Sequence, residues 1–136
     1  MPRSQPAEVH VRTGLDIVQV ARVERLLAEN PGADERIFTE RELSYSRGNG
    51  RSAEHLAARF AGKEAVLKAL GGPSGLDLRE IEIVGDDTGR PQVRLSGGAR
   101  EVAARIGVIE LDVSLSHSGG LAVAHAVALQ RGPIRP

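Results

Sequence analysis

The sequence predicts an α+β fold in which a mostly antiparallel sheet packs on one long helix. Three observations support this prediction. Residues 109–115 alternate between apolar and polar side chains, as a half-buried strand does. Two apolar runs, 81–84 and 92–95, flank a turn sequence and are typical of a β-hairpin. Residues 52–70 carry apolar side chains at helical spacing and precede Gly71, which predicts a long helix.

The N-terminal part predicts a strand followed by a helix. We expect a loose tail over 1–8, a single domain over 9–130 and a frayed end over 131–136. Residues 8–12 alternate as a strand does, and Asp16 is expected where the strand gives way to the helix. Apolar residues then recur at helical spacing up to Leu27, and the sequence Asn30-Pro31-Gly32 is a stop signal.

The middle of the chain predicts two helix starts. Thr39 and Glu42 have the spacing of a capping box, in which each side chain bonds the other residue's backbone amide. Ser52 has the position of an N-cap for the long helix.

The C-terminal part predicts a hairpin, a helix and two strands. Residues 86–89 read as the hairpin turn, and a helix over 99–106 ends at Gly107. We expect a turn over 116–120, followed by a strand over 121–129.

Composition limits the class of protein. The 136 residues are enough for one domain, but only three are aromatic, so the core must consist mainly of aliphatic side chains. Such thin layers make oligomerisation an expectation. The net charge is zero, and basic runs interleaved with aromatic residues are absent, so we expect no nucleic-acid binding.

Cysteine is absent, which excludes disulfides, thiolate nucleophiles and zinc–thiolate sites. The first residues lack the apolar segment of a signal peptide, and no apolar run has the length of a membrane span. We therefore expect a soluble cytoplasmic protein without membrane contacts.

The two lysines of the chain, Lys63 and Lys68, flank Glu64, whereas sixteen basic positions carry arginine. This usage indicates that a compact ammonium matters here. A helical wheel places Glu64 at the edge of an apolar face, which consists of Leu56, Phe60, Val66, Leu67 and Leu70. The alternative is a solvated surface pair between Glu64 and Lys68, worth about 0.3–0.5 kcal/mol.

Asp16 and Glu64 are the candidate acids. Together with substrate phosphates they can hold Mg²⁺, which binds through one or two protein carboxylates. The alternative for Asp16 is a helix cap. His117 lies among small residues that can approach an anion, although a simple hairpin turn is equally compatible. His125, between two valines, is interpreted as a packed histidine. Neither a Walker nor a dinucleotide-binding loop is present.

Four motifs occur in order: Gly14 to Val18, Arg59 to Gly71, Gly89-Arg90-Pro91, and Ser114 to Ser118. In this order they resemble the holo-[acyl-carrier-protein] synthases, the small single-domain type of 4′-phosphopantetheinyl transferase. The resemblance runs from about residue 11 to residue 129. The Phe-x-x-Lys-Glu-x-x-x-Lys segment is its specific part.

The resemblance implies a 4′-phosphopantetheinyl transferase-like, trimer-forming fold with active sites between neighbouring subunits. It also implies a Mg²⁺-dependent reaction. In that reaction phosphopantetheine passes from coenzyme A to a serine of an apo acyl carrier protein, and adenosine 3′,5′-bisphosphate is released.

The resemblance assigns roles to particular residues. Asp16 and Glu64 match the Mg²⁺-binding acids, and Lys68 joins them as a catalytic residue. Arg22 and Arg25 match the surface that docks the acidic recognition helix of the carrier. The residues that match the coenzyme-binding set are Arg51, Arg59, Lys68, Gly71, Pro91, His117 and Ser118.

The chain departs from the family pattern at two places: Arg12 stands at a usual glycine, and Gly72-Pro73 replaces a usual Thr-Gly. Two other functions remain as alternatives. One is a non-catalytic oligomeric module that binds a nucleotide or a carrier protein. The other is a metal-dependent phosphohydrolase.

Overall fold

The computed structural model of the chain describes residues 8–48, 52–85 and 87–132. Residues 1–7 of the predicted tail, residues 49–51 with Arg51, Asp86 and the terminal residues 133–136 lie outside these ranges. The described elements are, in order, β1 (Val9–Gln19), α1 (Val20–Glu29), α2 (Ala33–Ile37), α3 (Glu40–Gly48), α4 (Ser52–Ala69), the 3₁₀ helix η1 (Leu78–Glu80), β2 (Ile81–Gly85), β3 (Pro91–Leu95), α5 (Gly97–Ile106), β4 (Val108–Ser118) and β5 (Leu121–Arg131).

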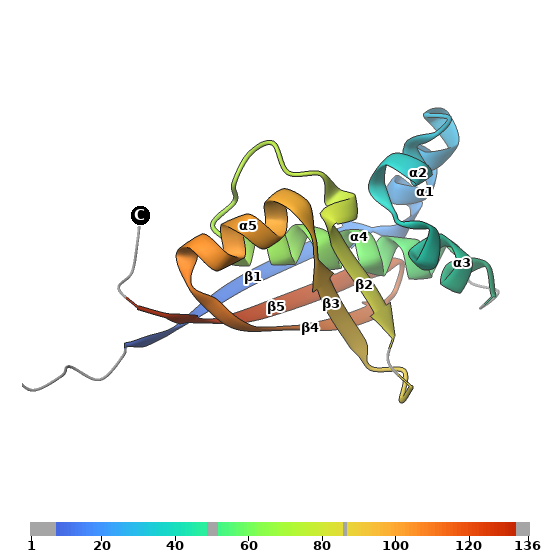
Figure 1. Cartoon of the computed structure of the whole chain (residues 1–136). Coiled ribbons are helices and arrows are strands. Elements are labelled where there is room, and N and C mark those ends of the chain that lie inside the picture. The colour runs from blue at the N-terminus through green and yellow to red at the C-terminus, as the bar shows by residue number, and fades with distance from the viewer. Residues whose placement is uncertain (1–7, 49–51, 86, 133–136) are drawn as a thin grey trace, which may run out of the picture.

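The strands form two antiparallel sheets (Figure 1). The larger sheet has the order β1-β5-β4, so the last strand of the chain lies in its centre. Strands β2 and β3 form a separate hairpin. The predicted α+β class and the antiparallel pairing are therefore confirmed, with the strands divided between two sheets.

Helix α4 lies between the larger sheet and a layer formed by α5 and the hairpin (Figure 1). Its contact with the sheet is made of small side chains. Ala61 and Ala65 are fully buried, as are Ala124 and Ala126 of β5. The predicted single apolar face was therefore wrong. The alanine face is buried as well, because α4 packs against other elements on both sides, although Lys68 near its C-terminal end is exposed.

Gly14 sets the distance between β1 and α4. A Cβ atom at this position would overlap the carbonyl oxygen of Ala65 and lie 2.8 Å from the amide nitrogen of Ala69. The strand backbone therefore passes directly over the last turns of α4, a close approach that glycine permits.

The first strand is longer than predicted. It runs without interruption to Gln19, and α1 begins at Val20, so Asp16 lies inside the strand and the predicted boundary at Asp16 was wrong. Hydrogen bonds to β5 continue through this segment and hold it extended. Helix α1 ends at Glu29, before Asn30, as predicted. The short helix α2 was not predicted.

Strand β4 is also longer than predicted. It continues to Ser118 and pairs with β5, and only Gly119 and Gly120 form the turn. Both glycines have positive φ, of 57° and 80°, as a two-residue hairpin turn requires. The predicted turn over 116–120 was therefore wrong, because His117 and Ser118 are strand residues. Strand β5 extends to Arg131, which pairs with Val9.

The predicted capping box of α3 is confirmed. The amide of Thr39 donates to Glu42 Oε1 at 2.9 Å, and the amide of Glu42 donates to Thr39 Oγ1 at 3.3 Å. Helix α4 starts at Ser52, where the N-cap was predicted, although the Ser52 side chain is outside the described set.

On the face of the larger sheet opposite α4, β1 and β5 carry mainly apolar side chains and are open in the single chain, whereas β4 carries Asp112, Ser114 and Ser116 there. Val11, Leu15 and Ile17 of β1 are 65%, 54% and 58% exposed. His125 lies on this face and is exposed, so its interpretation as packed was wrong for the chain alone. No helix in the described part of the chain has the length and apolarity needed to cross a membrane.

Candidate active site

Asp16, Glu64 and Lys68 come together where β1 crosses α4. The Lys68 Nζ atom lies 3.0 Å from Asp16 Oδ1 and 2.8 Å from the carbonyl oxygen of Leu15, to which it donates hydrogen bonds. Asp16 faces α4 because it follows Gly14 by two residues, and strand side chains alternate between faces. The structure thus joins an acid of the first strand to the helix that carries the second acid.

Glu64 lies beside this ion pair. Burial and the nearby negative charge of Asp16 raise the pKa of the Glu64 carboxyl group, and the positive charge of Lys68 partly offsets both effects. The two carboxylates are therefore close enough to repel each other, as expected where a cation binds between them.

Lys68 does not form the predicted alternative, a simple surface pair with Glu64. Its ammonium group bonds across to β1, although its side chain is 52% exposed. An exposed ammonium held at the edge of two acids remains accessible to an anionic ligand.

His117, near the end of β4, contacts a different part of α4. Its Nδ1 atom is 3.4 Å from Glu54 Oε2, near the N-terminal end of the helix. Glu54 precedes Glu64 by ten residues, which is about 15 Å along a helix axis. A single chain therefore does not bring His117 into the cluster around Asp16.

Arg59 is buried beneath Tyr45. The guanidinium carbon lies 4.6 Å from the centroid of the Tyr45 ring, and the Tyr45 ring stacks on His55 with centroids 5.8 Å apart. Burial lowers the pKa of Arg59, and the neighbouring Tyr45 and Glu42 oppose this effect. If Arg59 contacts a coenzyme phosphate, as the resemblance implies, its guanidinium would do so while stacked on Tyr45 or after leaving it. Its proposed companion Arg51 is outside the described residues.

The other predicted coenzyme contacts lie apart from one another. Gly71 ends α4 with a φ of 95°, and its amide donates to the carbonyl oxygen of Lys68 at 3.0 Å. Pro91 begins β3 and lines a cavity of about 490 Å³ beside β4. Ser118 ends β4 and is exposed.

Comparison with known proteins gives the family. A model described as the 4′-phosphopantetheinyl transferase superfamily matches residues 12–127. The chain belongs to this superfamily. A holo-[acyl-carrier-protein] synthase of Salinispora arenicola is 49% identical over 118 residues, which cover 87% of this chain and 97% of the relative. One of Geotalea daltonii is 46% identical over 118 residues, covering 85% and 94%.

Solved structures agree with this membership of the phosphopantetheinyl transferase superfamily. The ACPS–CoA complex of Chronobacterium ammoniagenes superposes with a TM-score of 0.79 at 30% identity. The match covers 88% of this chain and 96% of that one. The predicted family and fold class are confirmed.

The donors at the transferase site fit a magnesium ion. Mg²⁺ prefers oxygen ligands and commonly uses one or two carboxylates together with substrate phosphates. Asp16 and Glu64 supply two carboxylates whose charges repel each other. Within 8–48, 52–85 and 87–132, no group of three or more His, Cys, Asp or Glu side chains could hold a metal alone. The remaining ligands would therefore come from phosphate and water.

Arg22 and Arg25 are both exposed on α1, as expected of residues that meet a partner. Arg22 lines a groove of about 390 Å³ between β1, α1 and α4, whose other walls include Leu26 and Phe60. Arg25 is not part of the groove lining. The sequence analysis gave Arg22 and Arg25 the same role, whereas in the structure only Arg22 lines the groove.

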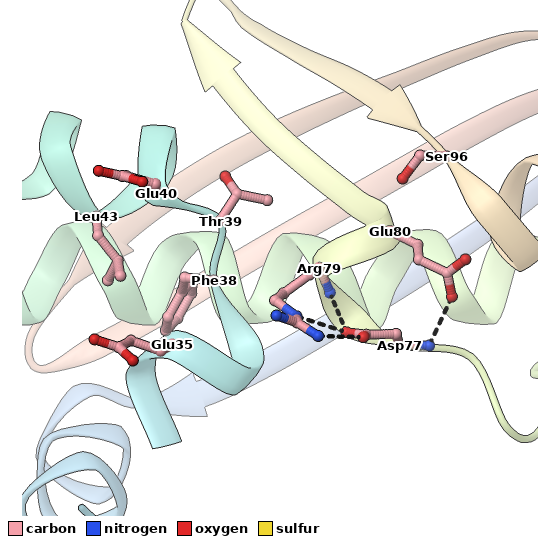
Figure 2. Close-up of a pocket in the computed structure, with 9 residues that line it drawn as sticks. All are labelled: Glu35, Phe38, Thr39, Glu40, Leu43, Asp77, Arg79, Glu80 and Ser96. Carbon is pink, nitrogen blue, oxygen red and sulfur yellow. Dashed lines mark hydrogen bonds and ion pairs between the residues drawn. The ribbon is translucent and has the colours of Figure 1, made fainter. Parts of the chain in front are cut away.

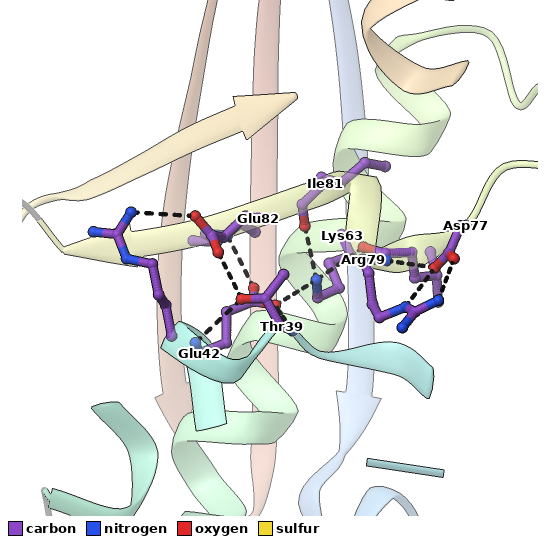
Figure 3. Close-up of polar contacts among 10 residues, drawn as sticks. Thr39, Glu42, Lys63, Asp77, Arg79, Ile81 and Glu82 are labelled. Carbon is purple, nitrogen blue, oxygen red and sulfur yellow. Dashed lines mark hydrogen bonds and ion pairs between the residues drawn. The ribbon is translucent and has the colours of Figure 1, made fainter. Parts of the chain in front are cut away.

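Lys63 has a structural role that the sequence did not reveal. Its ammonium group is completely buried, 2.7 Å from Glu42 Oε1, and donates to the carbonyl oxygens of Leu78 and Ile81 at 2.9 and 2.7 Å (Figure 3). Burial lowers the pKa of Lys63, and Glu42 opposes this shift. Lys63 therefore ties α4 to α3 and β2, on the opposite side from Asp16.

The departure at Arg12 also has a structural explanation. Arg12 Nε donates to the carbonyl oxygen of Ala69 at 2.7 Å, and Nη1 donates to Gln130 Oε1 at 3.3 Å. Arg12, Gly71 and Pro73 line one cavity of about 530 Å³. The two departures from the family pattern therefore occur side by side.

A cavity of about 600 Å³ opens away from this cluster, between α2, α3 and η1 (Figure 2). Asp77 and Arg79 on its wall form an ion pair at 2.9 Å, and Asp77 and Glu80 form the capping box of η1. None of the predicted site residues lines it. Asp77, Arg79 and Glu80 therefore stabilise the start of η1.

Proposed function

We propose that this chain transfers 4′-phosphopantetheine from coenzyme A to a serine of an apo acyl carrier protein. The observation that carries the proposal is the cluster of Asp16, Glu64 and Lys68, in which an ammonium lies 3.0 Å from one of two neighbouring carboxylates. The names of the relatives, and the coenzyme in the complex of a structural neighbour, support the same reaction.

In this proposal Asp16 and Glu64 are the residues that would hold Mg²⁺ when coenzyme A is bound. Bound there, the ion would offset the negative charge that develops on the phosphate oxygens. The carrier serine supplies the nucleophile, so the enzyme needs none of its own.

In this proposal Glu64 accepts the proton of the serine hydroxyl group as the new P–O bond forms. Lys68, about half exposed, can turn from Asp16 to the phosphate that leaves and donate a proton to it. Cleavage of the P–O bond within the diphosphate then releases adenosine 3′,5′-bisphosphate.

We further propose that the protein acts as a homotrimer. Two observations support this. Apolar side chains of β1 are exposed on the outer face of the larger sheet, and His117 lies far along α4 from Glu64. Residues such as Pro91, His117 and Ser118 would then meet the acids of a neighbouring subunit across one bound coenzyme.

The experiment is intact-mass analysis of an apo acyl carrier protein after incubation with the enzyme, coenzyme A and Mg²⁺. We expect one phosphopantetheinyl group to be added per carrier. Asp16→Asn and Glu64→Gln should each lower the rate by at least about 100-fold. Asp87→Asn, an exposed acid in the β2–β3 turn, is the matched control.

The outcomes separate the proposed activity from the alternatives. Coenzyme A binding without modification of several carriers would favour a non-catalytic module. Release of free phosphopantetheine in the absence of carrier would favour a phosphohydrolase. Normal turnover in either acid variant would remove the metal assignment.

A further inference from the structure

Two tethers join β1 to the C-terminal turn of α4, one on each side of Gly14. On one side, Arg12 of the strand donates to the carbonyl oxygen of Ala69 on the helix at 2.7 Å. On the other side, Lys68 of the helix donates to the carbonyl oxygen of Leu15 on the strand at 2.8 Å. Together they fix how the strand lies across the helix.

The two tethers have different environments. Lys68 is 52% exposed and also bonds Asp16, so it can be drawn away by an anion or lose its partner to a cation. The guanidinium of Arg12 is also anchored to Gln130, whose side chain is 1% exposed. Since arginine presents a planar fork of donors, it can hold both acceptors at once. Its charge also complements the carbonyl end of the helix.

We propose that Arg12 is a positioning residue that holds Asp16 against Glu64 when Lys68 turns to the substrate. Asp16 follows Arg12 by four residues, about 13 Å along a strand, so Arg12 acts through the backbone and not by touching the ion. The proposal rests on the proposed transferase function and on the Asp16–Glu64 metal site within it.

A second use of Arg12 must be distinguished from this one. Arg12 lines a cavity together with Arg105 of α5, and two arginines in one cavity could attract the anionic coenzyme by charge alone. Arg105 is therefore the matched control. Removing it takes the same charge from the same cavity, while the hydrogen bond between Arg12 and Ala69 remains.

The test measures binding directly, with no turnover. Mn²⁺ is titrated into the full-length protein with saturating coenzyme A and no carrier, and free Mn²⁺ is followed by electron paramagnetic resonance. Coenzyme A affinity is measured separately by calorimetry. For Arg12→Ala we expect Mn²⁺ affinity to fall by roughly tenfold, as for other groups that orient metal ligands, with coenzyme A affinity unchanged.

Two further variants complete the set. Arg105→Ala should change neither affinity. Arg12→Lys keeps the charge but loses the fork, so its Mn²⁺ affinity should lie between those of Arg12→Ala and the unmodified protein. If Arg12→Ala does not fold at the assay temperature, as judged by thermal unfolding, the Arg12→Lys variant carries the comparison.

Three results would overturn the role of Arg12: unchanged Mn²⁺ affinity in Arg12→Ala, unchanged Mn²⁺ affinity in Arg12→Lys, or an equal loss of coenzyme A affinity in Arg12→Ala and Arg105→Ala. Failure of the transferase proposal has a different signature. In that case the unmodified protein itself fails to bind Mn²⁺ or to modify a carrier.

Discussion

Lys63 and Lys68 are five residues apart on α4 and have opposite environments. Lys63 is fully buried and meets Glu42 and two backbone carbonyl groups, whereas Lys68 is about half exposed at the edge of β1. A buried ammonium must have hydrogen-bond acceptors for its donors, so its position is fixed by packing. An exposed ammonium can exchange partners, which suits a group that meets a ligand.

The first prediction concerns Lys63. Lys63→Met removes one member of a buried ion pair and leaves the Glu42 carboxylate without its cation. We expect the free energy of unfolding to fall by about 3–5 kcal/mol, measured by urea unfolding. Lys68→Met is the matched control and should cost less than about 1 kcal/mol, since exposed pairs contribute little. Equal losses in the two variants would contradict the structural role of Lys63.

At the scale of the elements, the crossing of β1 over α4 determines the site. The Asp16 side chain reaches Lys68 because Gly14 lets the strand backbone pass next to Ala65. A larger residue at position 14 would push the strand away and separate the two acids. The stability of the fold and the geometry of the proposed site therefore depend on the same contact.

The second prediction tests this contact. In Gly14→Ala the new Cβ atom meets backbone atoms, which cannot move aside as a side chain would. We expect a loss of about 1–3 kcal/mol in the free energy of unfolding, together with reduced carrier modification. Gly48→Ala, at the end of α3, is the control because a Cβ atom there meets nothing within 4 Å. An unaffected Gly14→Ala would show that the close approach is unimportant.

Helix α1 is the element that we propose meets the carrier protein. Its exposed Arg22 lines an apolar groove with Leu26 and Phe60, which matches a partner helix that is acidic at its edge and apolar at its centre. In the third prediction, Arg22→Glu raises KM for the carrier by roughly tenfold or more and leaves kcat nearly unchanged. Arg100→Glu, exposed on α5, is the charge-matched control. A fall in kcat at unchanged KM would exclude this docking role.

The sequence predicted the elements whose signals are local. Caps, stop signals and alternation depend on neighbouring residues, which is why α1, the Thr39–Glu42 box and the end of α4 were predicted correctly. The burial of the alanine face of α4 was not predicted correctly. It depends on the larger sheet packing on one side of the helix and on α5 and the hairpin packing on the other. Strand ends at Gln19 and Ser118 were also missed, since pairing with β5 sets them.

The same reasoning applies to the candidate site. The order of the motifs grouped Asp16, Glu64 and Lys68 in one site, and the structure brings Lys68 to Asp16. The buried pair of Lys63 and Glu42 could not be predicted, because its members are 21 residues apart and no local pattern links them. One available signal was that only two of the basic residues are lysine. This signal pointed to both Lys63 and Lys68, but it did not show that Lys63 is buried in an ion pair and that Lys68 is exposed beside Asp16.

At the scale of the whole molecule, the outer face of the larger sheet indicates an assembly. Exposed side chains on it include Val11, Leu15 and Ile17 of β1, and the central strand β5 adds His125, opposite Leu15 in the register. An exposed apolar patch of this kind is typical of a protein interface. A closed ring of identical subunits would cover it and bring a second chain to each active site.

The fourth prediction is that His125→Glu disrupts this assembly. His125 lies in the middle of the central strand, between Leu15 of β1 and Ser114 of β4, so in the proposed trimer a carboxylate there would be buried between subunits. A buried unpaired charge is unfavourable, and we expect a lower molar mass in light scattering coupled to size-exclusion chromatography. Carrier modification should fall with it, because the proposed site needs two subunits.

Ala104→Glu is the control for this prediction, since Ala104 is exposed on α5, on the other side of the molecule from the open sheet face. It adds the same charge and should keep both the mass and the activity of the unmodified protein. The two readouts must change together in His125→Glu. A monomer that still modifies its carrier at the normal rate would show that one chain holds a complete active site. His117 would then have to reach the coenzyme within its own subunit.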